Sequence, residues 1–215
     1  MHPDDGNGDV APVLVWRLDA QPVRCIASTV LGGGLGERSW ITNATVTLGY
    51  REVDPAAHAA RIATDRGLDP STGCGLLTGV DVTSFVAAAD EGAEVVATVG
   101  LGAVTWAAAP PGQHQQWRPG TVNVVAWVSE PLADAALVNL VATIAEAKAQ
   151  AFAAAGVPAT GTPSDAVVVC CPSMPPPDDD GHRYGGPRSW WGARVARAAH
   201  RAIAEGIAGD AAAPR

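Results

Sequence analysis

The chain has 215 residues, of which 47% are hydrophobic and 17% are charged, and its formal net charge at pH 7 is −8. This much apolar material can bury a sizeable core, whereas a net negative charge opposes binding to nucleic acids and anionic membranes. We therefore expect a small-molecule partner, no nucleic acid and no membrane, and the sequence leaves a homo-oligomer open. The first ten residues, MHPDDGNGDV, are acidic and polar, unlike a signal peptide. No apolar run reaches the roughly 20 residues of a membrane span, so we expect a cytoplasmic protein.

The chain is predicted to form one domain, because no linker rich in Gly, Ser or Pro divides its middle. We expect the domain over residues 11–207, with flexible tails at 1–10 and 208–215. Predicted strands occur in near-adjacent runs and only about three helices are long. This pattern favours an α/β or α+β fold with a mixed β-sheet.

The first half of the domain is predicted to contain three strands and one helix. The strands are rich in β-branched residues and cover 10–18, 22–29 and 43–50. The helix begins with Asp54 as N-cap, because an aspartate followed by proline is a typical helix start. We expect His58, in its first turn, to be solvated.

The glycines between the second and third strands are predicted to form a tight turn, in the segment LGGGLGERSW. A dinucleotide-binding fingerprint is not met, because Glu37 stands where its last glycine belongs, and the P-loop lysine is absent. A second glycine-containing segment, residues 71–79, is also interpreted as a turn. Residues 80–92 are predicted to form a short helix.

Two further strands are predicted, over 93–106 with a bend near Gly100, and over 120–129. Asn123 interrupts the apolar run of the second of these strands. Because a buried amide without hydrogen-bond partners costs roughly 1 to 3 kcal/mol, Asn123 should belong to a polar network or to a ligand site.

The four cysteines are interpreted as buried free thiols, and no metal site is predicted. Cys170 and Cys171 are adjacent in a predicted strand and should point to opposite faces of it. One metal ion is therefore not easily held by both.

A long Ala-rich helix is predicted over 133–155. Leu137 and Ile144 belong to an apolar stripe whose next position is Lys148, whereas Glu146 belongs to a polar stripe. Glu146 and Lys148 therefore point to different sides of the helix. From the periodicity alone we expect Glu146 to be solvated and Lys148 to extend along apolar surface towards water.

The segment after this helix is where we look for function first. A loop gathers polar side chains, and a buried strand with the sequence DAVVVCC follows. A loop between two well-packed elements can hold such side chains at fixed positions. The side chains are those of Thr160, Thr162, Ser164 and Asp165.

The last predicted helix covers 188–207. Trp191 and Val195 lie on its buried stripe, and its arginines, including Arg194, are expected to solvate the helix.

Several segments taken together resemble the adenosylcobinamide amidohydrolase family. They are ASTVLGGGLGERSWITN, GLLTGVDV, ATVGLG, GTVNVVAWV, TIAEAKAQAF, ATGTPSDAVVV and RYGGPRSWWGARVARAAHRAI. Their order and spacing cover the chain from about residue 11 to residue 207. The chain departs from the family pattern at Ala145 and Ser164, where a threonine is expected before Glu146 and Asp165.

The resemblance implies an amidohydrolase domain that cleaves the amide between the aminopropanol arm and the corrin ring of adenosylcobinamide, giving adenosylcobyric acid. The corrinoid is then a substrate, and no cofactor is expected. Amide hydrolysis needs a nucleophile, a proton for the departing amine and donors for the oxyanion. We predict that a carboxylate activates water without a metal ion.

The predicted catalytic residues are Glu146 and Asp165 as acid and base, Thr162 as a hydroxyl, and Lys148 as a partner of a carboxylate or a proton donor. The predicted substrate-binding residues comprise two amides, which would act as oxyanion or substrate-amide donors, and four loop positions. These residues are Asn43, Asn123, Gly33, Gly34, Thr160 and Gly161.

Two alternatives stay open. In the first, the nucleophile is the hydroxyl of Thr121 or Thr162, each of which follows a glycine and could be exposed by self-cleavage. In the second, the protein binds or carries a corrinoid without catalysis. The second is less favoured, because no histidine stands out as a cobalt ligand.

Overall fold

The structure is a computed structural model that describes residues 11–18, 23–47, 49–112 and 120–212. The predicted tail at 1–10 lies outside these residues, and so does the end of the other predicted tail, 213–215. None of the helices in the described part of the chain is long and apolar enough to cross a membrane.

The larger of two sheets has six strands in the order β3-β2-β9-β8-β7-β6, and β8 and β9 are its parallel pair. The other neighbouring strands run antiparallel. The strands of this sheet are β2 (Val23–Ala27), β3 (Gly34–Arg38), β6 (Val86–Asp90), β7 (Ala93–Val99), β8 (Val122–Val128) and β9 (Ala166–Pro172).

The smaller sheet has three strands in the order β1-β4-β5, with β1 antiparallel and β5 parallel to the central β4. These strands are β1 (Val13–Arg17), β4 (Trp40–Thr45) and β5 (Gly73–Thr78). Each sheet contains both parallel and antiparallel pairs, and three long helices accompany them, which confirms the α/β class.

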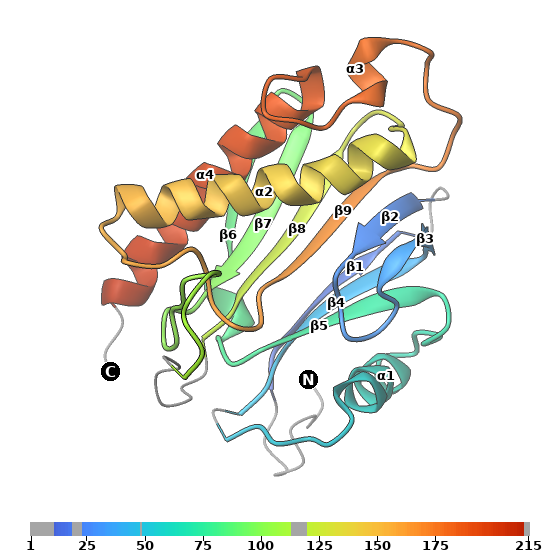
Figure 1. Ribbon diagram of the computed structural model, residues 1–215. Coiled ribbons are helices and arrows are strands. Elements are labelled where there is room, and N and C mark those ends of the chain that lie inside the picture. Colours follow the sequence, from blue (N-terminus) through green and yellow to red (C-terminus); the bar gives the residue numbers. More distant parts are fainter. Residues whose placement is uncertain (1–10, 19–22, 48, 113–119, 213–215) are drawn as a thin grey trace.

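The elements form four layers (Figure 1). Helices α2 (Asp134–Ala154) and α4 (Trp190–Ala212) cover one face of the six-stranded sheet, and the small sheet packs on its other face. Helix α1 (Pro55–Asp65) lies on the outer side of the small sheet. A 3-10 turn (Val82–Ser84) and the short α3 (Asp180–Arg183) complete the described elements.

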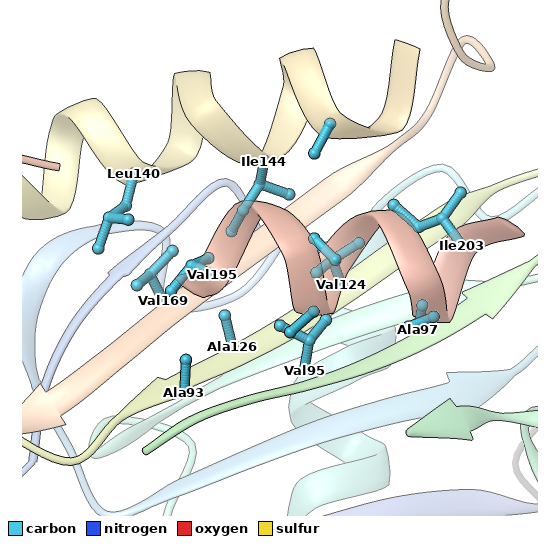
Figure 2. Close-up of a cluster of buried hydrophobic side chains, with 14 of the residues drawn as sticks. Ala93, Val95, Ala97, Val124, Ala126, Leu140, Ile144, Val169, Val195 and Ile203 are labelled. Carbon is cyan, nitrogen blue, oxygen red and sulfur yellow. The ribbon is translucent and has the colours of Figure 1, made fainter. Parts of the chain in front are cut away.

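The main core lies between the two long helices and the six-stranded sheet. Figure 2 shows Leu140 and Ile144 of α2 beside Val195 and Ile203 of α4, above small side chains of the strands. All four are fully buried. Each contributes about 1.5 to 3 kcal/mol relative to an exposed position. A second core between the sheets contains Cys170, whereas Cys171 belongs to the first, which confirms that these thiols are buried on opposite faces.

The glycine turn predicted at residues 71–79 is in fact strand β5. In the other glycine segment, Gly32 and Gly33 lie in the connection between β2 and β3 as predicted, and β3 takes up the rest of it. The prediction at β5 was wrong because its glycines serve packing rather than turning. A Cβ on Gly73 would enter the indole ring of Trp40, and a Cβ on Gly75 would lie 3.2 Å from Ala59. These glycines let β5 approach its neighbours closely, a requirement that the sequence alone does not reveal.

The predicted helix at 80–92 is also wrong, because only a 3-10 turn forms there and β6 follows it. Glu91 and Gly92 both have positive φ angles, 41° and 91°, and join β6 to β7 as a tight hairpin. Pairing with β7 therefore outweighs the helix propensity of the three alanines in β6.

Three smaller corrections concern the ends of elements and one arginine. The strand predicted at 43–50 covers Trp40–Thr45 instead, and α4 continues to Ala212, where a flexible tail was predicted from residue 208. Arg194 is buried, because its guanidinium pairs with Glu91 and lies 3.7 Å from the Trp190 ring centroid.

Candidate functional site

A pocket of about 280 Å³ lies where the loops after β2, β4 and β5 meet the loops before β8 and β9. Segments far apart in the sequence therefore form one wall. The residues that line it are Ser28, Thr29, Val30, Val46, Thr47, Tyr50, Pro55, Leu76, Leu77, Thr78, Gly79, Ala103, Gly120, Thr121, Pro163, Ser164 and Ala166.

The chemistry of this lining is neutral. Apolar side chains alternate with hydroxyl groups from serines, threonines and one tyrosine. Among the lining residues that the structure describes, none is Asp, Glu, His, Lys, Arg or Cys. An apolar wall with a few hydroxyls is suited to a neutral polar group such as an amide.

Two of these hydroxyls form a pair at the loop that the sequence favours. The Oγ1 atom of Thr121 lies 2.9 Å from the Oγ atom of Ser164, so one donates to the other. Ser28 is attached to the same region, because the N–H of Val167 donates to its Oγ over 2.9 Å. The start of β9 thus holds Ser164 against the start of β8.

Next to this pair, the Asp165 clamp consists of Asp165, Lys148, Thr162 and the backbone of Val122. The ammonium of Lys148 and the hydroxyl of Thr162 donate to different oxygens of the carboxylate. The N–H groups of Val122 and Thr162 donate over 2.8 and 3.0 Å. The side chains of Lys148 and Asp165 are 15% and 12% exposed.

The clamp therefore fills all four acceptor positions of the Asp165 carboxylate. The expectation that Lys148 extends to water is wrong, because its ammonium pairs with Asp165, and this pairing with a carboxylate is one of the two roles predicted for it. The predicted catalytic roles of Asp165, Lys148 and Thr162 stay predictions, and none of the three lines the pocket.

Two of the predicted substrate-binding positions build the wall of the clamp instead of the pocket. A Cβ on Gly161 would collide with the Asp165 carboxylate and would lie 2.6 Å from Lys148 Nζ. Thr160 accepts from the N–H of Ala107 at its hydroxyl over 2.9 Å, and the N–H of Thr105 donates to the carbonyl of Gly161 over 2.8 Å. These contacts fix the loop.

The two predicted amide donors lie between the sheets, in a buried trio with Thr98. Asn123 donates to Asn43 over 2.9 Å and to the carbonyl of Leu77 over 3.1 Å, and Asn43 donates to Thr98 over 3.1 Å. The polar network expected around Asn123 is confirmed. Because the side-chain N–H groups of Asn123 already donate to Asn43 and to the Leu77 carbonyl, the placement does not favour a role as oxyanion donor.

The remaining predicted residues lie apart from the pocket lining. Glu146 is exposed on α2, whereas Lys148 points inward on the same helix. The two side chains thus lie on different sides of the helix, as the helical periodicity predicts. Gly33 allows a close backbone approach, since a Cβ there would lie 2.8 Å from the Thr29 carbonyl oxygen. Gly34 begins the edge strand β3. Their predicted roles stay predictions.

Comparison with known proteins identifies the family of this chain. A family model described as adenosylcobinamide amidohydrolase matches residues 3–214. The chain belongs to the adenosylcobinamide amidohydrolase family. A protein of Halobacterium salinarum named adenosylcobinamide amidohydrolase is 64% identical over 52 residues. That match spans 24% of this chain and 22% of the relative.

In this member of the family, sequence reasoning missed one pair of side chains at the pocket. Tyr50 lines the pocket, and its hydroxyl lies 3.0 Å from Nδ1 of His58. His58 was expected to be solvated but is only 4% exposed. No sequence period joins these residues, since Tyr50 lies before the helix that carries His58. Among the described residues, no three His, Cys, Asp or Glu side chains converge as a metal site would require.

Proposed function

We propose that this chain hydrolyses adenosylcobinamide at the amide between its aminopropanol arm and the corrin ring, and so supplies adenosylcobyric acid in corrinoid salvage. The observation that carries the proposal is the family match over residues 3–214. The neutral, hydroxyl-lined pocket supports it, because the bond to be cleaved is an uncharged amide.

The size of the pocket determines how much of the substrate enters it. Its 280 Å³ lie at the lower end of the range of ligand pockets, which is about 300 to 1,000 Å³. A short arm with its amide fits this volume, but a tetrapyrrole-like macrocycle does not. We therefore propose that the arm enters and that the ring lies outside the mouth.

Within the pocket, the hydroxyls of Thr121 and Ser164 are proposed to contact the scissile amide. One can donate to the carbonyl oxygen while the other accepts from the amide N–H, which orients the carbonyl carbon for attack. The Asp165 clamp holds the loop that carries Ser164. Asp165 is then a positioning residue rather than a group that touches substrate.

The test is incubation of the purified chain with adenosylcobinamide, with and without a chelator, followed by chromatographic detection of adenosylcobyric acid. Product in both samples supports the proposal together with the predicted metal-free route. Product that disappears only with chelator keeps the reaction but overturns that route. Tight corrinoid binding without product supports the carrier alternative instead.

A further inference from the structure

Tyr50 carries the one titratable side chain among the lining residues of the pocket that the structure describes. The other polar groups there are aliphatic hydroxyls and backbone atoms, which are weaker acids than a phenol. Yet cleavage of an amide requires a proton to leave the attacking water and another to reach the departing nitrogen. The described lining offers one candidate group for this transfer.

His58 lies directly behind Tyr50 and is in contact with it. The Tyr50 hydroxyl is 3.0 Å from His58 Nδ1, and the two rings stack with centroids 5.4 Å apart and an interplanar angle of 22°. His58 is buried on α1, and Pro55 of the same helix also lines the pocket. The pair therefore connects the pocket to a buried imidazole, the side-chain type whose ordinary pKa is near neutrality.

We infer that Tyr50 and His58 form the proton relay of the proposed amide hydrolysis, with Tyr50 touching the reacting atoms and His58 holding the proton behind it. This inference rests on the proposed function. It assigns the acid and base roles to residues other than Glu146 and Asp165.

The oxygen of a water molecule forms a bond to the carbonyl carbon, while one proton of that water passes to the Tyr50 oxygen and the phenolic proton passes to His58 Nδ1. When the C–N bond breaks, the proton returns from Nδ1 through Tyr50 to the departing nitrogen. The products are a carboxylic acid and a free amine, and both side chains return to their initial state.

The surroundings of Tyr50 favour such a concerted transfer over a free phenolate. Burial first, and then the charge of Glu52, raise the pKa of Tyr50 to about 12, while Arg61 lowers it and Asp54 raises it. Arg61 also pairs with Glu52 over 3.3 Å. A phenol with this pKa stays protonated, so it gives one proton only as it receives another.

The experiment compares Tyr50→Phe and His58→Gln with the wild type in kcat, KM and the pH profile of kcat/KM. Tyr184→Phe is the matched control, because it makes the same change at the other tyrosine, which is exposed and does not line this pocket. Corrinoid binding is measured separately by visible absorption titration with adenosylcobinamide, and folding by circular dichroism.

We expect Tyr50→Phe to lower kcat by about 10² to 10⁴-fold, the usual contribution of general acid–base catalysis, with corrinoid binding changed by less than ~3-fold. His58→Gln should lower kcat as well and remove the acid limb of the pH profile, because the base that limb reports is gone. Tyr184→Phe should match the wild type.

A Tyr50→Phe enzyme that keeps kcat within ~3-fold of the wild type would overturn the relay while leaving the amidohydrolase intact. An unchanged acid limb in His58→Gln would remove His58 from the relay. A wild type that binds corrinoid but forms no product overturns the proposed function, and the relay with it. If Tyr50→Phe fails to fold, the pH profile of His58→Gln decides alone.

Discussion

The Asp165 clamp and the pocket wall are neighbouring polar regions with opposite organisation. In the clamp, two charged side chains and three uncharged donors or acceptors satisfy one another, and Gly161 closes the space around them. On the pocket wall, Ser164, Thr121 and Tyr50 are neutral and border an open cavity. The loop before β9 supplies both regions, so the charged side of this loop fixes the position of its neutral side.

The largest expected effect comes from removing the carboxylate at the centre of the clamp, Asp165. Asp165→Asn removes the carboxylate and leaves the mostly buried ammonium of Lys148 without its partner, which we expect to lower the free energy of unfolding by about 3 kcal/mol. Urea denaturation measures this change. Asp178→Asn is the control, because Asp178 pairs with Arg183 but is 87% exposed, and its loss should cost less than about 1 kcal/mol.

The same variant separates a positioning role from a catalytic one. If Asp165 only holds the loop, the folded fraction of Asp165→Asn should retain measurable turnover, and Lys148→Met should behave similarly. If both variants are as stable as the wild type but lose turnover completely, Asp165 and Lys148 act on the substrate and the clamp interpretation is wrong. If Asp165 and Lys148 only hold the loop as a pair, the double variant Asp165→Asn/Lys148→Met should be less destabilised than the sum of the two single variants.

A second prediction concerns the closure of the clamp by Gly161. Gly161→Ala places a methyl group against the Asp165 carboxylate and Lys148 Nζ, so we expect a loss of about 1 to 3 kcal/mol from overpacking. The midpoint of thermal or urea unfolding measures it. Gly209→Ala in α4 is the control, because no atom lies within 4 Å of its new Cβ, and alanine should leave the helix equal or more stable. Equal stability of both variants would show that the clamp has room.

A third prediction concerns the pair of hydroxyls on the neutral pocket wall. Ser164→Ala and Thr121→Val each remove one hydroxyl of the pair, and we expect kcat/KM to fall about 10-fold, which corresponds to one hydrogen bond of about 1.4 kcal/mol. Steady-state kinetics with adenosylcobinamide measure this effect. A loss beyond ~10³-fold in Thr121→Val alone would instead identify Thr121 as the nucleophile of the alternative mechanism. The intact mass then shows whether the chain cleaves itself before Thr121.

The sequence predicts the regular elements of the fold well where one periodicity dominates. The long helix at 133–155 and the strand at 120–129 match α2 and β8, because their apolar patterns extend over many residues. It fails at β3, β5 and β6, whose residues show no dominant period and which form by pairing with β2, β4 and β7. Gly73 in β5 reads as a turn residue until Trp40 is placed against it.

In the candidate site, too, the sequence predicts what is local and misses what depends on packing. The loop containing Thr160 to Asp165 was found because its polar side chains are adjacent in the sequence. Pairing of Lys148 with a carboxylate was one of its two predicted roles, but the apolar stripe predicted that its ammonium reaches water, and Asp165 was not identified as the partner. Tyr50 and His58 were missed, because their relation to the pocket depends on how α1 packs on the small sheet.

Glu146 provides the weakest expected effect and the clearest contrast between sequence and structure. The proposed amide chemistry made Glu146 a predicted acid or base, whereas the helical periodicity predicted a solvated side chain, and the side chain is exposed on α2 and does not line the pocket. We therefore expect Glu146→Gln to change the free energy of unfolding by less than about 0.5 kcal/mol and to leave kcat unchanged. Kinetics and urea denaturation, run beside Glu205→Gln on α4 as a second glutamate variant, measure both quantities. A large fall in kcat for Glu146→Gln alone would mean that the substrate reaches the outer face of α2, and the pocket assignment would then have to be abandoned.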